Sequence, residues 1–124
     1  MRDRLARATV LLAVLGIVGG CFPASRPQRV DTISSITGRW VGELADRGGA
    51  YPITITLRED GTWEGVSLGQ RFHGITKLVD GKVRLMNLVT GGGTTYTLYE
   101  SEGQLVLRGL RDDGFVAGRL KPVP

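Results

Sequence analysis

Glycine-marked turns recur along the chain at almost constant intervals, and this regularity constrains the fold more than any other feature. Seven turn signals follow one another 9–12 residues apart. They are Gly48-Gly49, Asp60-Gly61, Gly69-Gln70, Asp80-Gly81, Gly91-Gly92-Gly93, Glu102-Gly103 and Asp113-Gly114. An acidic residue followed by glycine suits a tight hairpin, because glycine accepts a positive φ angle and aspartate tolerates one. Seven such turns predict eight strands joined by hairpins.

Between these turns, apolar side chains alternate with polar ones, as in strands that bury one face. The alternation is clearest in residues 51–57, 82–85, 95–99 and 105–108. β-Branched and aromatic residues, which favour strands, are frequent in these segments. We therefore predict an all-β domain at residues 36–124, folded as a small eight-stranded antiparallel up-and-down barrel. Closure removes exposed sheet edges, which favours a barrel over the alternative, a flattened two-sheet sandwich.

The alternation also predicts which side chains fill the barrel. We expect fifteen of them inside: Trp40, Leu44, Ile53, Ile55, Leu57, Trp63, Phe72, Leu78, Val83, Leu85, Tyr96, Leu98, Leu105, Leu107 and Phe115. Five of these are aromatic, so a barrel this small should be filled by its own side chains, with at most a shallow mouth. Seven apolar residues fall on the opposite face: Val41, Ile75, Met86, Leu88, Val106, Val116 and Leu120. They either adjoin as a patch that docks a partner or a second copy, or are scattered surface residues, or lie on strands that an N-terminal segment covers.

Two copies of the pattern G-x-W-x-G stand 23 residues apart, at residues 38–42 and 61–65. A glycine near tryptophan makes room for the large ring and lets a strand bend. The first copy resembles the G-x-W of the first strand in lipocalins and other calycins. That resemblance implies a calycin-like barrel, and for a lipocalin-like carrier an apolar cavity walled by Trp40 and Trp63. The chain departs from lipocalins in size, because lipocalins are much longer.

The first twenty residues differ in kind from the rest. Arg2, Arg4 and Arg7 precede an apolar run of 13 residues at positions 8–20. A charged start followed by a short apolar stretch and small residues is typical of an export signal. As a helix, this run spans about 20 Å, which is short of the roughly 30 Å of a bilayer core. We therefore expect a cleaved helical signal segment at residues 1–20.

The end of this run carries the only cysteine. Val18-Gly19-Gly20-Cys21 resembles the lipobox of bacterial lipoproteins, which is an aliphatic residue, two small residues and then cysteine. The resemblance implies cleavage before Cys21 and acylation of its thiol and new amino group. Two or more acyl chains hold a protein stably on a membrane, so the lipid anchor makes the membrane a partner of this chain.

Residues 21–35 are expected to form a flexible tether between the lipid and the domain. Pro23 and Pro27 stiffen its start, and its composition is polar. Phe22 stands where lipoproteins retained in the inner membrane of many Gram-negative bacteria carry aspartate. By that resemblance, the protein is expected in the cell envelope at the outer membrane.

Few residues in the sequence have the chemistry of catalysis or metal binding. His73 is the only histidine, so no Ser-His-Asp set can be singled out, and the acidic pairs 59–60 and 112–113 fall at hairpin tips. A glycosidase pair must instead converge across a cleft. The chain without residues 1–20 keeps 13 basic and 11 acidic side chains of alternating sign, which is no nucleic-acid footprint. We expect no enzyme activity, cofactor, metal or nucleic acid.

Three functions remain open. The leading hypothesis is a non-catalytic envelope lipoprotein whose barrel binds a protein or envelope component by its surface. The alternatives are a lipocalin-like carrier of a small apolar ligand and a periplasmic inhibitor of proteases or lysozyme, the last by architectural resemblance alone. Candidate binding residues are Trp40, Trp63, Met86, Leu88 and Val106, beside Cys21 as the lipidation site. The sequence does not fix the oligomeric state.

Overall fold

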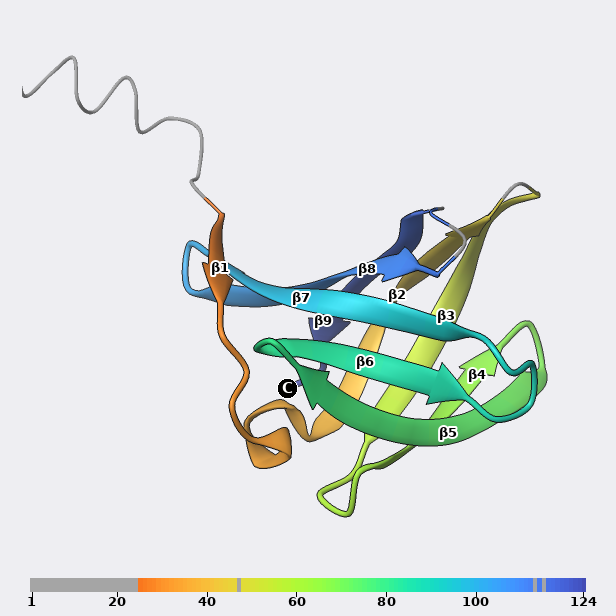
Figure 1. The fold of residues 1–124 in the computed structure, drawn as a ribbon. Helices are drawn as coiled ribbons and strands as arrows, with labels where there is room; N and C mark the ends of the chain where they lie inside the picture. Colours follow the sequence, from red (N-terminus) through yellow and green to blue (C-terminus); the bar gives the residue numbers. More distant parts are fainter. Residues whose placement is uncertain (1–24, 47, 113, 115) are drawn as a thin grey trace, which may run out of the picture.

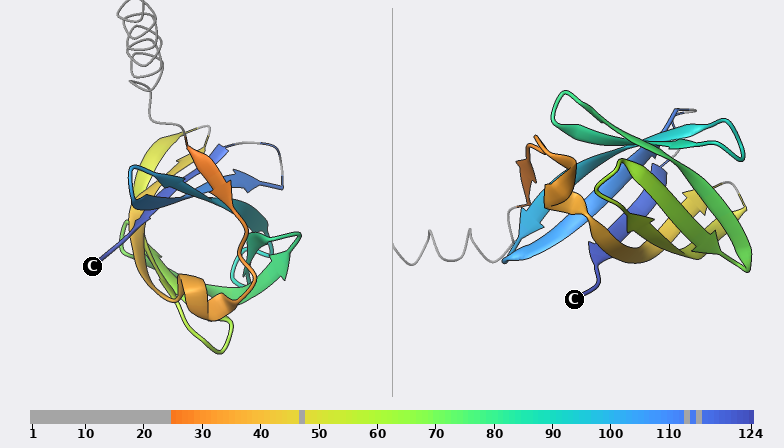
Figure 2. Two further views of the ribbon diagram at one scale, coloured as in Figure 1. Left: turned by 90° about the vertical axis from the view of Figure 1, so that its left-hand side faces the viewer. Right: turned by 90° about the horizontal axis from the view of Figure 1, so that it is seen from below.

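The protein is a closed barrel of eight antiparallel strands, described here from a computed structural model (Figure 1). The structure describes residues 25–46, 48–112, 114 and 116–124. The barrel strands are β2 (Gly38–Asp46), β3 (Gly49–Leu57), β4 (Thr62–Ser67), β5 (Gln70–Val79), β6 (Lys82–Asn87), β7 (Gly93–Ser101), β8 (Gln104–Arg111) and β9 (Val116–Pro122). Each pairs with the next, and β9 returns to β2, where Trp40 stands opposite Pro122. Seen end-on, the strands form a ring (Figure 2, left), so the prediction of a closed barrel is confirmed.

All seven predicted turns separate consecutive barrel strands. Leu68-Gly69, Asp80-Gly81 and Glu102-Gly103 have positive φ angles at both residues, between 51° and 76°. Two positive φ angles define the type I′ turn, whose twist matches that of the strands it joins. The glycine signal in the sequence therefore reflects backbone conformation directly.

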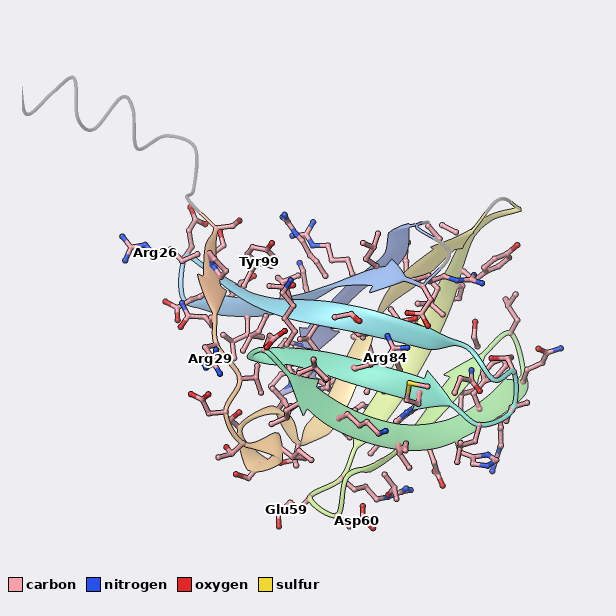
Figure 3. All side chains as sticks on the ribbon, viewed as in Figure 1. Arg26, Arg29, Glu59, Asp60, Arg84 and Tyr99 are labelled. Atoms are coloured by element: carbon pink, nitrogen blue, oxygen red, sulfur yellow. The ribbon has the colours of Figure 1, made fainter. Side chains whose placement is uncertain are left out.

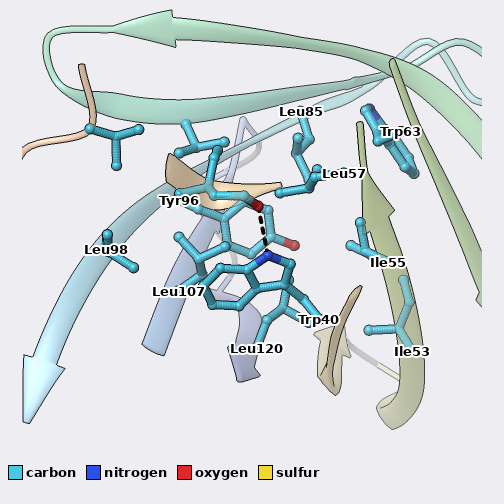
Figure 4. Packing of buried hydrophobic residues seen from close by; sticks show 13 residues of the cluster. Trp40, Ile53, Ile55, Leu57, Trp63, Leu85, Tyr96, Leu98, Leu107 and Leu120 are labelled. Carbon is cyan, nitrogen blue, oxygen red and sulfur yellow. Dashed lines mark hydrogen bonds between the residues drawn. The ribbon is translucent and has the colours of Figure 1, made fainter. Parts of the chain in front are cut away.

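The predicted interior is largely confirmed. Ten of the fifteen side chains are buried in one apolar cluster: Trp40, Ile53, Ile55, Leu57, Trp63, Val83, Leu85, Tyr96, Leu98 and Leu107 (Figure 4). Four more are partly buried against that cluster, namely Leu44, Phe72, Leu78 and Leu105. Phe115 lies outside the described residues.

The prediction that Leu120 faces outward is wrong. Leu120 is fully buried in the core, opposite Gly42 on β2 and Leu107 on β8. The cause is a β-bulge: Gly109 pairs with Gly118 but Leu110 pairs with Val116, so β9 carries one extra residue there. An extra residue shifts the inward–outward alternation along the strand, and the apolar pattern alone does not reveal it.

The segment before the barrel is structured from residue 26 onward, which corrects the expected flexible tether. A short strand, β1 (Arg26–Gln28), pairs with residues 98–100 of β7, beyond the part of β7 that pairs with β6. The 3-10 helix η1 (Ile33–Ile36) then lies at one end of the barrel (Figure 2). Val30 and Ile36 are at most 2% exposed and belong to the core. Their burial outweighs the polar composition of the segment.

This segment closes one end of the barrel, which we call the closed end. The amide of Val30 donates a hydrogen bond to the carbonyl of Gly81 (2.8 Å), and the indole of Trp40 donates one to the carbonyl of Ile36 (2.9 Å). The turns β3–β4, β5–β6 and β7–β8 lie at this end, because strands alternate in direction. The other four connections surround the opposite end, which we call the mouth.

Candidate functional site

A pocket of about 660 Å³ opens at the mouth and extends into the barrel. Its inner wall is apolar and comes from five strands: Leu44, Ile53, Ile55, Trp63, Phe72 and Leu85. The interior is filled toward the closed end, as expected, whereas the mouth holds a larger hollow than the shallow one expected. The rings of Trp63 and Tyr96 face inward as expected, but each lies along the wall of the barrel.

Trp63 shows how this happens. Its indole crosses the inner side of β5 and donates a hydrogen bond to the carbonyl of Met86 on β6 (3.2 Å). A Cβ on Gly65 would lie 3.2 Å from the ring, and a Cβ on Gly74 would lie 2.7 Å from the indole nitrogen. The ring therefore lies against two glycines, and the absence of their side chains lets a tryptophan occupy the wall instead of the lumen.

A glycine also makes room for the ring of Tyr96, on the opposite wall of the barrel. A Cβ on Gly109 would lie 2.5 Å from the Tyr96 ring, so the ring packs flat against β8. Tyr96 lines the pocket, yet only 2% of the residue is exposed. Burial raises the pKa of its hydroxyl, which therefore stays protonated at neutral pH.

The rim of the pocket is polar and is braced by an ion pair. Arg84 points outward from β6 (Figure 3) and reaches across Gly93 to bind Asp112 through two hydrogen bonds of 2.8 Å. This bidentate contact lowers the pKa of Asp112 and raises that of Arg84. Further polar lining comes from Ser67, Gln70, Asn87, Thr90, Thr94 and Arg111. The pair fixes the start of the β8–β9 connection beside the pocket.

Apolar side chains also gather at the mouth. Leu68, Leu88 and Val89 are 67%, 60% and 54% exposed, the highest values among the large apolar side chains of the described residues. Leu68 sits in the β4–β5 turn, and the other two sit in the β6–β7 connection. We call these three residues the apolar rim.

The structure separates the sequence-predicted binding residues. Trp63 lines the pocket, whereas Trp40 does not and instead packs toward the closed end. Leu88 belongs to the apolar rim, and Met86 stands on β6 opposite Ile75. Val106 is only 4% exposed, although it is outside the interior cluster.

Met86 and Val106 do not adjoin. Their partners on β7 are Gly93 and Tyr99, six residues apart, or about 20 Å along a strand. The binding role of these residues stays a prediction, and Cys21 lies outside the described residues.

Sequence reasoning offered the pocket only as part of the carrier alternative, with Trp40 as a second wall residue, and it missed the position of Tyr96 in the lining. The signal that marks the pocket is a set of glycines inside strands, Gly65, Gly74 and Gly109, each opposite an aromatic ring. A glycine in a strand interior indicates close approach of another group. Which glycine lies against which ring depends on the register between neighbouring strands, and that register is known only from the structure.

His73 and the acidic pair 59–60 lie apart from the pocket, whereas Asp112 lines its rim. His73 is exposed on β5, and Glu59 and Asp60 lie at the β3–β4 tip (Figure 3). Asp60 accepts hydrogen bonds from the hydroxyl (2.6 Å) and amide (2.9 Å) of Thr62, which lower its pKa. Among the described residues, no three His, Cys, Asp or Glu side chains stand close enough to hold a metal ion, and no helix has the length and apolar character to span a bilayer.

Comparison with protein-family models, with curated proteins and with solved structures gives no match to this chain.

Proposed function

We propose that this protein is a non-catalytic envelope lipoprotein whose barrel holds a small apolar ligand in the pocket at its mouth. The pocket of about 660 Å³ carries this proposal. Ligand sites in proteins typically enclose about 300–1,000 Å³ and combine an apolar wall with a few polar groups. The inner wall formed by Ile53, Ile55, Phe72 and Leu85 and the polar rim fit that description. Of the functions that the sequence leaves open, the carrier is the one that uses this pocket.

The apolar rim supports entry of such a ligand. Leu68 both lines the pocket and is the most exposed large apolar side chain among the described residues. An apolar molecule that leaves a membrane or a partner would meet these side chains before the polar atoms of the rim. Contact with them lowers the apolar area that the molecule exposes to water during transfer.

The proposed anchor would lie at the other end of the molecule. β1 begins at Arg26, which pairs with Glu100 next to the β7–β8 turn of the closed end. Five residue steps from Cys21 to Arg26 reach at most about 18 Å. Acylation of Cys21 would therefore hold the closed end within about 18 Å of the lipid, with the mouth directed away from it.

Fluorescence titration with N-phenyl-1-naphthylamine tests ligand binding. The wild-type protein should bind this apolar probe saturably. Thr94 lines the pocket on β7, so Thr94→Trp should fill part of the cavity and weaken binding at least about tenfold, the equivalent of about 1.4 kcal/mol. Thr97→Trp is the matched control, because Thr97 has the opposite orientation on the same strand. Equal binding by all three proteins would contradict the proposal.

Mass spectrometry of the protein extracted from membranes tests the anchor. We expect a chain that starts at Cys21 and carries acyl groups, and release of the Cys21→Ser variant from the membrane fraction. An unmodified Cys21 in the membrane-extracted protein would refute lipidation and leave the pocket proposal intact.

Docking of a protein partner is the second candidate function, and the apolar rim favours it. Leu68, Leu88 and Val89 gather at one end of the molecule, where a partner would bury them together. Replacing all three by serine should abolish partner capture from detergent-solubilised membranes while probe binding in the pocket remains. Unchanged capture by the triple variant would exclude docking at the rim.

A further inference from the structure

The hydroxyl of Tyr96 is a polar group at the pocket with no partner among the described protein groups. Within the part of the chain that the structure describes, this hydroxyl has no hydrogen-bond partner, and desolvation alone accounts for its raised pKa. The two tryptophans of the interior differ in this respect. Trp40 and Trp63 each donate to a backbone carbonyl, at 2.9 Å and 3.2 Å. The barrel thus pairs the buried N–H of both indoles but not the O–H of Tyr96.

The position of this hydroxyl is fixed by packing. The ring cannot retreat toward β8, because it already occupies the space above Gly109. Figure 4 shows the side chain reaching from β7 into the barrel interior, among Trp40, Leu107 and Leu120. Tyr96 is almost fully buried and still lines the pocket. Its hydroxyl is therefore a polar atom of fixed position at the inner part of the pocket.

The unpaired Tyr96 hydroxyl makes no hydrogen bond that stabilises the barrel itself. Among the described residues, the Thr76 hydroxyl is the fully buried side-chain polar atom without a partner, so the unpaired Tyr96 hydroxyl must keep some contact with the pocket. The Tyr96 side chain lines the pocket and no described protein group pairs with the hydroxyl, so the hydroxyl is available to a ligand atom there. Resting on the proposed function, we infer that the ligand is a neutral apolar molecule that directs a carbonyl or hydroxyl group to Tyr96.

The side chains that line the pocket determine whether the ligand group bound by Tyr96 can carry a charge. The apolar lining of the pocket includes Ile55, Trp63 and Leu85, which offer no positive charge. A carboxylate or phosphate there would lose its hydration with one hydroxyl as compensation, which is unfavourable. The charged side chains among the described lining residues, Arg111 and Asp112, lie at the rim, where an ionic end of the ligand would have to remain.

Displacement of N-phenyl-1-naphthylamine by 9-fluorenone and by fluorene tests this inference. The two competitors share one rigid skeleton and differ by a single carbonyl. For the wild type and Tyr96→Phe, the ratio of fluorenone to fluorene affinity is compared, so that the difference in hydrophobicity between the competitors cancels. We expect the ratio to fall about 3- to 10-fold in Tyr96→Phe, as for loss of one hydrogen bond.

Two controls complete the experiment. Tyr99→Phe removes a hydroxyl from the outer face of β7, where the Tyr99 ring lies under Arg108, and should leave the ratio unchanged. Fluorene-9-carboxylate should bind at least about tenfold more weakly than fluorenone. Urea unfolding checks that each variant is folded.

The outcomes separate the inference from the proposed function. An equal ratio in the wild type and Tyr96→Phe, with both competitors bound, would overturn the role of Tyr96 and leave the pocket as a binding site. Preferential binding of the carboxylate would overturn the neutral ligand. Failure of the wild type to bind the probe or either competitor would overturn both the inference and the proposed function.

Discussion

The indole nitrogen of Trp63 lies 2.7 Å from the point where a Cβ on Gly74 would stand, so Trp63 crosses β5 only because residue 74 is glycine. The same Cβ would also lie 1.7 Å from the carbonyl oxygen of Met86, which accepts the hydrogen bond of that indole. One glycine thus holds the tryptophan on the barrel wall and keeps the pocket open.

Gly74→Ala should therefore destabilise the barrel. The added methyl group meets both a ring and a backbone atom, and overpacking of this kind costs about 1–3 kcal/mol or more. Urea unfolding measures the change. Gly92→Ala is the matched control, because the nearest atom to a Cβ there is the Thr90 hydroxyl at 3.7 Å. Its free energy of unfolding should change by less than about 0.5 kcal/mol. Equal effects of the two substitutions would contradict the account of Trp63.

Thr76→Val should raise the free energy of unfolding by about 1 kcal/mol. The Thr76 hydroxyl oxygen is buried and has no hydrogen-bond partner among the described residues, and valine keeps the shape of the side chain without that cost. Thermal or urea unfolding provides the measurement. The comparison is Thr97→Val on the outer face of β7, which should be nearly neutral. A loss of stability in Thr76→Val would reveal a partner for this hydroxyl.

Ile36→Ala should cost about 2–5 kcal/mol, as expected for a large aliphatic side chain removed from a core. Ile36 is 1% exposed, and its carbonyl accepts the hydrogen bond of Trp40. Ser34→Ala alters an exposed residue of the same 3-10 helix and should change stability by less than about 0.5 kcal/mol. If Ile36→Ala were as mild as Ser34→Ala, residues 26–36 would not form part of the folded domain.

The ion pair between Arg84 and Asp112 predicts a pH dependence. Folding lowers the pKa of Asp112 through the hydrogen bond from Arg84. The stability from this pair is therefore fully present above the pKa of an unfolded aspartate, about 4, and is lost as pH falls through that value toward the lower folded-state pKa. Arg84→Gln should be less stable than the wild type at neutral pH. The difference in the free energy of unfolding between the two proteins should become smaller below about pH 4. A difference in the free energy of unfolding that stays constant down to about pH 2 would contradict this role of the ion pair.

Much of the fold was predictable because its signals are local. A glycine with positive φ marks a hairpin at Gly69, Gly81 and Gly103, and apolar alternation shows which face each strand buries. Leu120 escaped prediction because a bulge shifts the alternation by one residue. The burial of Ile36 also escaped, because four residues of 3-10 helix are too short to show a periodic pattern.

The candidate site was less predictable because it depends on where rings lie, not on which residues are present. The sequence shows that Trp63 and Tyr96 face inward. It does not show that Gly74 and Gly109 stand beneath them and draw both rings to the wall. Such pairings follow from the strand register, in which Trp63 stands opposite Gly74 and Tyr96 opposite Gly109.

Nuclear magnetic resonance titration of the barrel with N-phenyl-1-naphthylamine tests the central claim most directly, because it reports both binding and its location. The account predicts saturable amide shifts that cluster at the pocket wall, at Leu44, Ile55, Leu85 and Tyr96, with little change at Val30 and Ile36 of the closed end. Absence of saturable shifts, or shifts confined to residues of the outer face, would contradict it.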